Sequence, residues 1–197
     1  MSTISQTVFK YRSYTPIPFL ILMLIFQRAT LTSLIVGFII ALTGEGFRLW
    51  GVSYAGSETR TTGSVGGTYL VISGAFAHVR NPLYLGNILL YFGIGVMSMA
   101  LFPYLQIIAL IYFYIQYRLI IAEEEKYLSK TFGEKYVKYT KAVGRLIPKV
   151  KKFEDPSVEQ PAFNLKSGLK SEKRSLQAFS AVTIILIILF IINNYKF

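Results

Sequence analysis

Long apolar runs dominate the hydrophobic pattern of this 197-residue chain. Residues 16–50 are almost continuously apolar, with an interruption at residues 27–30 that contains the charge of Arg28. A helix rises about 1.5 Å per residue and the hydrocarbon core of a bilayer is about 30 Å thick, so this run is too long for one span. We therefore expect a tight hairpin of two transmembrane helices, the second ending near Trp50 and Tyr54, which are typical of the membrane interface.

Three more apolar runs follow along the chain. Residues 83–102 and 104–122 are separated by Pro103 in a turn without charge, and residues 176–192 are close to the lower length limit for a span. The pattern predicts an all-α, polytopic membrane protein with four core transmembrane helices and a fifth at the C-terminus. We divide the chain into a membrane core (1–152), a polar linker (153–175) and a C-terminal transmembrane helix (176–197).

The segments between the apolar runs are polar. Residues 51–82 are rich in Gly, Ser and Thr, whereas residues 123–174 mix acids and lysines with aromatic residues, and Gly133 and Gly144 predict helix stops there. Thirteen of the 21 lysines and arginines lie in this second segment. Because cytoplasmic loops carry the excess of basic residues, both segments are expected on the cytoplasmic side.

The residues near the N-terminus agree with this orientation. Lys10 and Arg12 precede the first span, and Arg60 and Arg80 lie in the 51–82 loop. The outer loops carry little more than Arg28. The start of the chain lacks a small-residue cleavage site after its apolar part, so we expect it to be retained.

Composition supports the membrane assignment. The chain is 53% hydrophobic and 16% charged, with a mean hydropathy of +0.47, which is too apolar for a soluble domain. It has no cysteine and one histidine, which argues against disulfides and against a metal site. The net charge of +11 is explained by loops that face anionic lipid, so no nucleic-acid partner is expected. No obligate protein partner is evident either.

Several short motifs follow one another from the end of the 51–82 loop onwards. They are Arg80-Asn81-Pro82-Leu83-Tyr84 with Gly86-Asn87, Gly93-Ile94-Gly95, Glu123-Glu124-Glu125, Phe132-Gly133 and Gly144-Arg145-Leu146-Ile147-Pro148. In order and spacing these motifs resemble the integral-membrane methyltransferases that include the isoprenylcysteine carboxyl methyltransferases and the phospholipid N-methyltransferases. The resemblance covers roughly residues 35–150.

The resemblance implies an enzyme that uses S-adenosylmethionine and a cofactor pocket between the last core spans and the cytoplasmic helical segment. Four residues are expected to contribute to the cofactor site: Gly93, Gly95, Glu124 and Glu125. The turn that closes the same pocket contains Arg80, Asn81, Pro82 and Tyr84. Arg145 is expected near the cofactor or the acceptor. The enzyme would lie in the cytoplasmic membrane with its cofactor site on the cytoplasmic side.

The acceptor that the resemblance implies is lipophilic and embedded in the membrane, either an isoprenylcysteine-like carboxylate or a phospholipid amine. Asn81 stands where the carboxyl methyltransferases commonly carry His, so the acceptor stays open. A protonated amine must lose a proton before it is methylated, and either His78 or one of the glutamates 123–125 is available to accept it. Arg145 and His78 are the catalytic candidates. We include Arg48, Tyr136 and Tyr139 as candidate substrate contacts.

Most of these residues also have an ordinary structural explanation. Glycines two apart in an apolar helix permit close helix packing. Glu45 and Arg48 can pair along one helix face, as can Glu123 and Lys126. Asn81 suits a helix N-cap with Pro82 in the first turn. Tyr136 and Tyr139 can be core residues.

Two other functional classes stay open at this point. A membrane sterol or enone reductase that uses NADPH has a similar proline turn and basic tail. A non-enzymatic membrane subunit or small transporter is the third hypothesis, but a solute path needs polar residues along the spans, and few are present besides Glu45 and Arg48.

Overall fold

The computed structural model describes residues 3–56 and 69–194. These residues form six α-helices and one short 3-10 turn, and no β-strand occurs among them. The elements are α1 (Thr3–Tyr11), α2 (Pro16–Ile25), α3 (Leu31–Ala55), η2 (Gly74–Ala77), α4 (Pro82–Ser98), α5 (Tyr104–Ala142) and α6 (Leu165–Asn194). The predicted all-helical fold class is confirmed. Arg60, which helped to orient the spans, lies outside the described residues.

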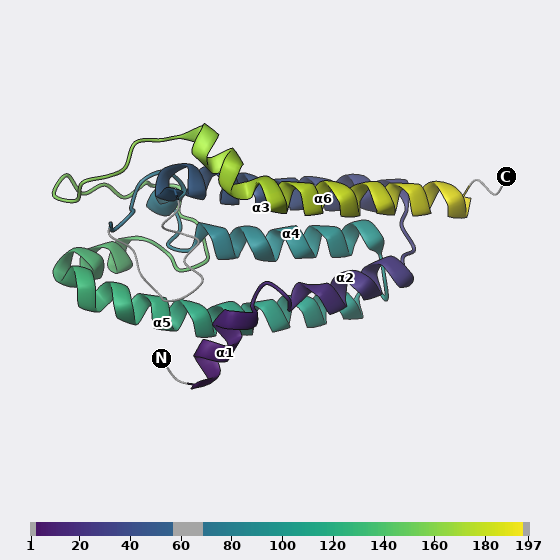
Figure 1. Cartoon of the computed structure of the whole chain (residues 1–197), viewed down its shortest axis with the longest axis horizontal. Coiled ribbons are helices and arrows are strands. Elements are labelled where there is room, and N and C mark those ends of the chain that lie inside the picture. Colours follow the sequence, from purple (N-terminus) through teal and green to yellow (C-terminus); the bar gives the residue numbers. More distant parts are fainter. Residues whose placement is uncertain (1–2, 57–68, 195–197) are drawn as a thin grey trace.

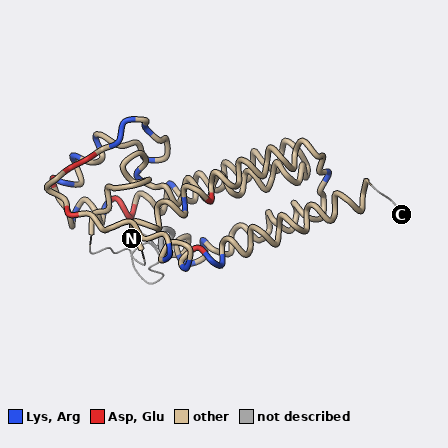
Figure 2. The backbone as a smooth tube through the Cα atoms, turned by 90° about the horizontal axis from the view of Figure 1, so that it is seen from above, with Lys and Arg blue, Asp and Glu red and all other residues tan. Residues whose placement is uncertain are grey.

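The long helices run side by side (Figure 1). α3 lies along α6, α4 packs against α3, and α5 and α2 lie on the other side of α4. Most charged residues gather at one end of this bundle, which we call the polar end (Figure 2). There α3 ends, α4 and α6 begin, and the last turns of α5 leave the bundle.

Among the described residues, three helices, α3, α5 and α6, are long and apolar enough to cross a membrane. α2 and α4 are apolar but shorter. The 17 residues of α4 span about 25 Å, against a hydrocarbon core of about 30 Å. The five predicted transmembrane segments are therefore helical, and three of them have the full length expected of a span.

The turn predicted between the first two apolar runs is present. α2 ends at Ile25 and α3 begins at Leu31. Thr30 caps α3: the Ser33 amide donates to the Thr30 hydroxyl at 3.1 Å, and the Thr30 amide donates to the Ser33 hydroxyl at 2.9 Å. This reciprocal capping box satisfies two backbone donors that would otherwise lack a partner at the helix start.

Glycines bring the backbones of α3 and α4 into direct contact. A Cβ atom added at Gly93 would lie 2.4 Å from the backbone nitrogen of Ala41, and one added at Gly37 would lie 2.4 Å from that of Met97. Only a residue without a side chain fits at such distances. Nearer the start of α4, a Cβ atom added at Gly44 would lie 2.5 Å from the Gly86 carbonyl oxygen, so this part of α4 is also held close to α3.

Two helix boundaries differ from the prediction. The charged segment after residue 122 continues α5 up to Ala142, and Gly133 with φ of 52° produces a kink there instead of the predicted stop. α6 begins at Leu165, so residues 165–175 of the predicted polar linker are helical. Their buried members, Gly168 and Glu172, face the rest of the bundle, and this is why the helix extends into a polar stretch.

The chain between α5 and α6 returns across the polar end. The Arg80 amide donates to the Gly144 carbonyl at 2.9 Å, and the Lys149 amide donates to the His78 carbonyl at 2.9 Å. Farther along, the Phe153 amide donates to the Ala77 carbonyl at 3.0 Å. These bonds fasten the returning segment to the turn that precedes α4, so residues far apart in the sequence meet there.

Candidate functional site

Three charged side chains meet at the polar end. Arg80 Nη2 lies 3.0 Å from Glu125 Oε1, and Arg145 Nε lies 3.0 Å from the same oxygen. Arg145 Nη2 also donates to the second oxygen of Glu125. We call these residues the two-arginine cluster. One carboxylate bridges two guanidinium groups, so the cluster keeps one positive charge in excess.

Arg80 is held by backbone carbonyls of α5 and the residue after it. Its Nη1 donates to the carbonyl of Thr140 at 2.8 Å and to that of Val143 at 3.3 Å. The C-terminal end of a helix carries partial negative charge and attracts such a cation. The Nε of Arg80 is buried and has no hydrogen-bond partner, so the cluster retains an unused donor.

Asn81 and Pro82 start α4 as predicted, with Asn81 at the N-cap and Pro82 in the first turn. However, the Asn81 side chain does not cap the helix. Its Nδ2 donates instead to the Arg145 carbonyl at 3.0 Å. The side-chain capping role is therefore wrong, and Asn81 serves to attach the segment that carries Arg145.

The three consecutive glutamates of α5 point to three different partners. Glu123 pairs with Lys126 at 3.1 Å, as predicted, and Glu125 joins the two-arginine cluster. Glu124 accepts a hydrogen bond of 2.7 Å from the Tyr84 hydroxyl. Because successive residues of a helix lie about 100° apart, the three carboxylates do not compete for one place.

An open hollow of about 580 Å³ lies beside the two-arginine cluster. Glu125, Tyr136 and Arg145 line it together with lysines of α5. It therefore offers a carboxylate, a guanidinium and an aromatic ring to one ligand. Tyr136 is itself almost fully buried, so it forms a firm wall.

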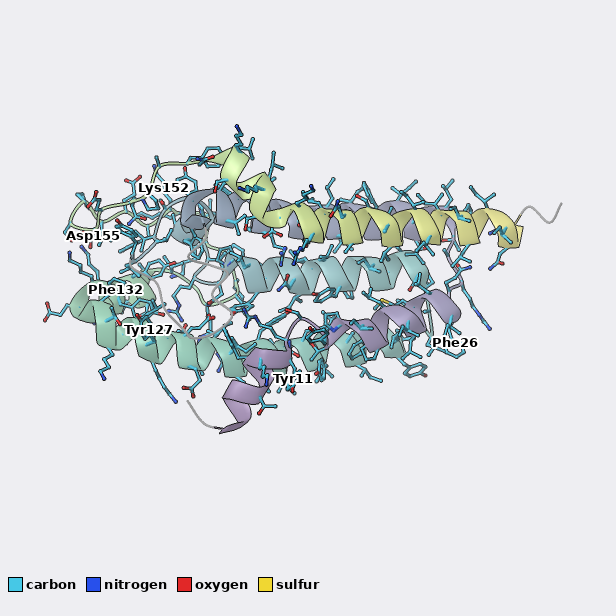
Figure 3. All side chains as sticks on the ribbon, in the orientation of Figure 1. Tyr11, Phe26, Tyr127, Phe132, Lys152 and Asp155 are labelled. Atoms are coloured by element: carbon cyan, nitrogen blue, oxygen red, sulfur yellow. The ribbon has the colours of Figure 1, made fainter. Side chains whose placement is uncertain are left out.

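His78 lies at a different hollow, of about 700 Å³, on the same end of the molecule. Its Nδ1 lies 2.8 Å from the Lys149 carbonyl, and its ring lies 5.6 Å from that of Trp50. A carbonyl only accepts, so Nδ1 carries the proton and Nε2 is left as the acceptor of the neutral ring. The loop with Lys152 and Asp155, labelled in Figure 3, forms the other wall. The structure does not bring His78 to the two-arginine cluster.

Tyr139 is occupied by the protein's own backbone. Its hydroxyl donates to the Phe76 carbonyl at 2.7 Å, and its ring lies in a small core with Leu70 and Ile72. This is the structural explanation that the sequence already offered. A substrate contact at Tyr139 stays a prediction without a contact here that supports it.

Gly93 and Gly95 lie along α4 away from the charged residues. Gly93 lies twelve positions after Asn81, which corresponds to about 18 Å of helix. Gly93 contacts α3 as described, and Gly95 faces the side chains of Met23 and Gln106. The structure accounts for both glycines by packing, and their place in a cofactor site stays a prediction.

Arg48 belongs to a second charged group, between the apolar helices. It contacts Glu45 on its own helix at 3.5 Å, Glu172 of α6, and the Asn87 side chain of α4. We call Glu45, Arg48 and Glu172 the two-glutamate cluster. The predicted Glu45–Arg48 pair is confirmed, but the guanidinium is engaged on three sides. Its predicted contact with a substrate is untested.

Glu172 is a member of this cluster that the sequence did not predict. This residue is 1% exposed and joins α6 to α3 and α4. One signal was available: the buried residues of α6 recur at the helical period, at Gly168, Glu172, Phe179, Thr183 and Leu186. The stripe was overlooked because its first members lie in a stretch that reads as a polar linker.

Comparison with known proteins supplies one match. The phospholipid methyltransferase family matches residues 32–135, more than half of the chain. Arg80, Tyr84, Glu124 and Glu125 lie within the matched region, whereas Arg145 lies beyond it. A search of curated proteins finds no match.

Proposed function

The chain belongs to the phospholipid methyltransferase family, and from this membership we propose that it transfers a methyl group from S-adenosylmethionine to a phospholipid amine. It is an integral membrane protein, with three helices long and apolar enough to span a bilayer. The observation that carries the proposal is the meeting of Arg80, Glu125 and Arg145 beside an open hollow.

The residues at this place suit the methyl donor. Its amino acid end carries a carboxylate, which the excess positive charge of the cluster and the Arg145 guanidinium at the hollow would attract. Glu125 would accept from hydroxyl or ammonium groups of the same ligand. The hollow of about 580 Å³ lies within the range of about 300–1,000 Å³ that is usual for small-molecule sites.

When bound, S-adenosylmethionine supplies a methyl group activated by the sulfonium. The protein must hold the acceptor in line with that group and exclude water. An ammonium acceptor must also lose a proton before its nitrogen can bond to carbon. Glu124, oriented by the Tyr84 hydroxyl, is the carboxylate that we assign to this proton. His78 stays the alternative acceptor, through its Nε2.

We further propose that α2 and α4 complete the membrane domain as the fourth and fifth spans. The polar end, with its many basic residues, then faces the cytoplasm, where the soluble donor is available. The acceptor reaches the site sideways from the bilayer. Family membership favours this activity over the NADPH-dependent reductase and over a non-enzymatic subunit.

The test is methyl transfer by the full chain reconstituted in vesicles that contain phosphatidylethanolamine. With donor labelled in its methyl group, label should appear in the extracted lipid, and the matched variant Glu124→Gln should lose this transfer. The control Glu123→Gln, a neighbouring carboxylate that pairs with surface Lys126, should keep it. Label that never leaves the donor in the wild-type protein would contradict the proposal.

A further inference from the structure

Arg12 is held in place at the polar end by the helix before it. Its guanidinium carbon lies 3.7 Å from the centre of the Phe9 ring, and its Nη1 donates to the Phe9 carbonyl at 2.9 Å. The Thr15 hydroxyl donates to the Arg12 carbonyl at 3.0 Å. Stacking and hydrogen bonding together hold the Arg12 guanidinium more firmly in place than the guanidinium of an exposed arginine.

The same contacts place Arg12 near Glu124. Phe9 is buried in a cluster with Tyr117, Ile120 and Ile121 of α5, which form the turn before Glu124. Figure 1 shows α1 lying against this part of α5. Arg12 and Glu124 attract each other electrostatically, yet these two described side chains form no direct ion pair. Tyr84, which bonds to Glu124, packs against the same cluster as Phe9, which holds Arg12, so this cluster holds both charges.

We propose that Arg12 and Glu124 bind the two ends of a zwitterionic phospholipid headgroup, Arg12 the phosphate and Glu124 the ammonium. The proposal rests on the proposed function, because it identifies the acceptor of that reaction. A guanidinium is well suited to phosphate, since its planar donors match two phosphate oxygens. The Tyr84 ring packs against the Tyr117 ring with centroids 4.9 Å apart, and its hydroxyl donates to Glu124, so the Glu124 end is fixed in place.

The lipid tails have a matching surface. α2 begins four residues after Arg12, at Pro16, and runs away from the polar end. Ile17, Ile21 and Ile25 are exposed on it and recur every four residues, so they form one apolar stripe along the helix. A lipid with its phosphate at Arg12 would lay its acyl chains along this stripe. A headgroup that lacks chains would leave the stripe uncovered.

The experiment is native mass spectrometry of the full chain in detergent, titrated with three lipids of identical acyl chains. Phosphatidylethanolamine carries both charges, phosphatidylglycerol carries only the phosphate, and diacylglycerol carries neither. Wild-type protein should bind phosphatidylethanolamine at least about tenfold more tightly than diacylglycerol, the effect of about one charge-assisted contact. Arg12→Gln should remove this preference, and Arg12→Lys should keep part of it.

Two more variants sharpen the result. Lys10→Gln removes a charge from an exposed neighbour that lies over the Tyr11 ring, and it should bind all three lipids as the wild type does. Glu124→Gln should abolish the preference for phosphatidylethanolamine over phosphatidylglycerol. An unchanged preference in Arg12→Gln, or an equal loss in Lys10→Gln, would overturn the proposal.

Methyl transfer measured beside binding separates the two proposals. Transfer to phosphatidylethanolamine with an unchanged KM in Arg12→Gln overturns the headgroup site and leaves the activity standing. Lipid selectivity that depends on Arg12, without transfer to any lipid, overturns the activity and leaves the headgroup site standing.

Discussion

The two charged clusters of this protein have opposite compositions. In the two-arginine cluster one glutamate, Glu125, serves two guanidinium groups; in the two-glutamate cluster one arginine, Arg48, serves two carboxylates. The first lies at the polar end, where Arg145 is 32% exposed. The second lies between helices, where Glu172 is 1% exposed.

These opposite compositions decide which residue is the most costly to remove from each cluster. Removal of a majority charge leaves a neutral pair, whereas removal of the minority charge leaves two like charges side by side. The two clusters also differ in their tasks. The two-arginine cluster lies beside an open hollow, so it can bind a ligand, whereas the two-glutamate cluster is enclosed between α3, α4 and α6 and joins them.

The largest effect should come from Arg48→Met. Without the guanidinium, Glu45 and Glu172 face each other in an apolar interior, and breaking such a buried arrangement costs about 3–5 kcal/mol. Thermal unfolding in detergent should show a large loss of stability. The triple variant with Glu45→Gln and Glu172→Gln should recover most of it, and Glu172→Gln alone should cost less than Arg48→Met. Equal stability of Arg48→Met and the wild type would contradict this account.

Gly93→Ala should have the next largest effect. Its Cβ would meet the backbone of α3 at 2.4 Å, so the two helices must move apart at a cost of about 3 kcal/mol. Gly95→Ala is the matched control, because its Cβ would meet the terminal methyl of Met23 at 3.1 Å and a methionine end can shift. Thermal unfolding that ranks Gly95→Ala as the more damaging change would show that the packing assignment is wrong.

Glu125→Gln should follow, with a loss of about 2 kcal/mol, smaller than for Arg48 because this cluster is partly open to solvent. Arg80 and Arg145 are then left together without a carboxylate. Arg145→Gln should cost less, since the Arg80–Glu125 pair remains neutral. Chemical or thermal unfolding of the two variants measures the two losses of stability. A larger loss in Arg145→Gln than in Glu125→Gln would contradict the assignment of Glu125 as the residue that holds both arginines.

The smallest effect concerns the loop at the second hollow. Hydrogen bonds from Lys138 and Ser157 lower the pKa of Asp155 to about 2. A lowered carboxyl pKa stabilises the fold above the unfolded pKa of about 3.9 and loses that contribution as pH falls toward 2. The single tryptophan, Trp50, lines the same hollow, so its fluorescence should report loop opening between about pH 4 and pH 2. Asp155→Asn should lack this step, and an identical step in that variant would refute the assignment.

Apolar runs were enough to predict every long helix and the turn before α3, because hydrophobic length is a local property of the sequence. The apolar runs did not predict where α5 ends or where α6 begins. Gly133 is a typical helix stop, but here it only bends a helix that tertiary contacts continue. Glu172 looked like a linker residue because its partner Arg48 lies 124 residues away.

The candidate site, like the fold, could be predicted from the sequence only in part. The resemblance put Arg80, Asn81, Glu125 and Arg145 near one pocket, and the structure brings them together, while their role in cofactor binding stays a prediction. Tyr136, a candidate substrate contact, lines the hollow beside them. It does not bring Gly93 or His78 there. A glycine in an apolar helix suits a ligand and a neighbouring helix equally, so its residue type alone does not decide between them. Arg12 was noted only for its charge, since nothing local shows that Phe9 anchors it beside α5.

The most direct test is calorimetric titration of the detergent-purified protein with S-adenosylhomocysteine and, in parallel, with NADPH. The account predicts saturable binding of S-adenosylhomocysteine alone, lost in Glu125→Gln and kept in Glu123→Gln. Binding of NADPH alone, or S-adenosylhomocysteine affinity that Glu125→Gln leaves unchanged, would contradict the claim that the two-arginine cluster holds the methyl donor.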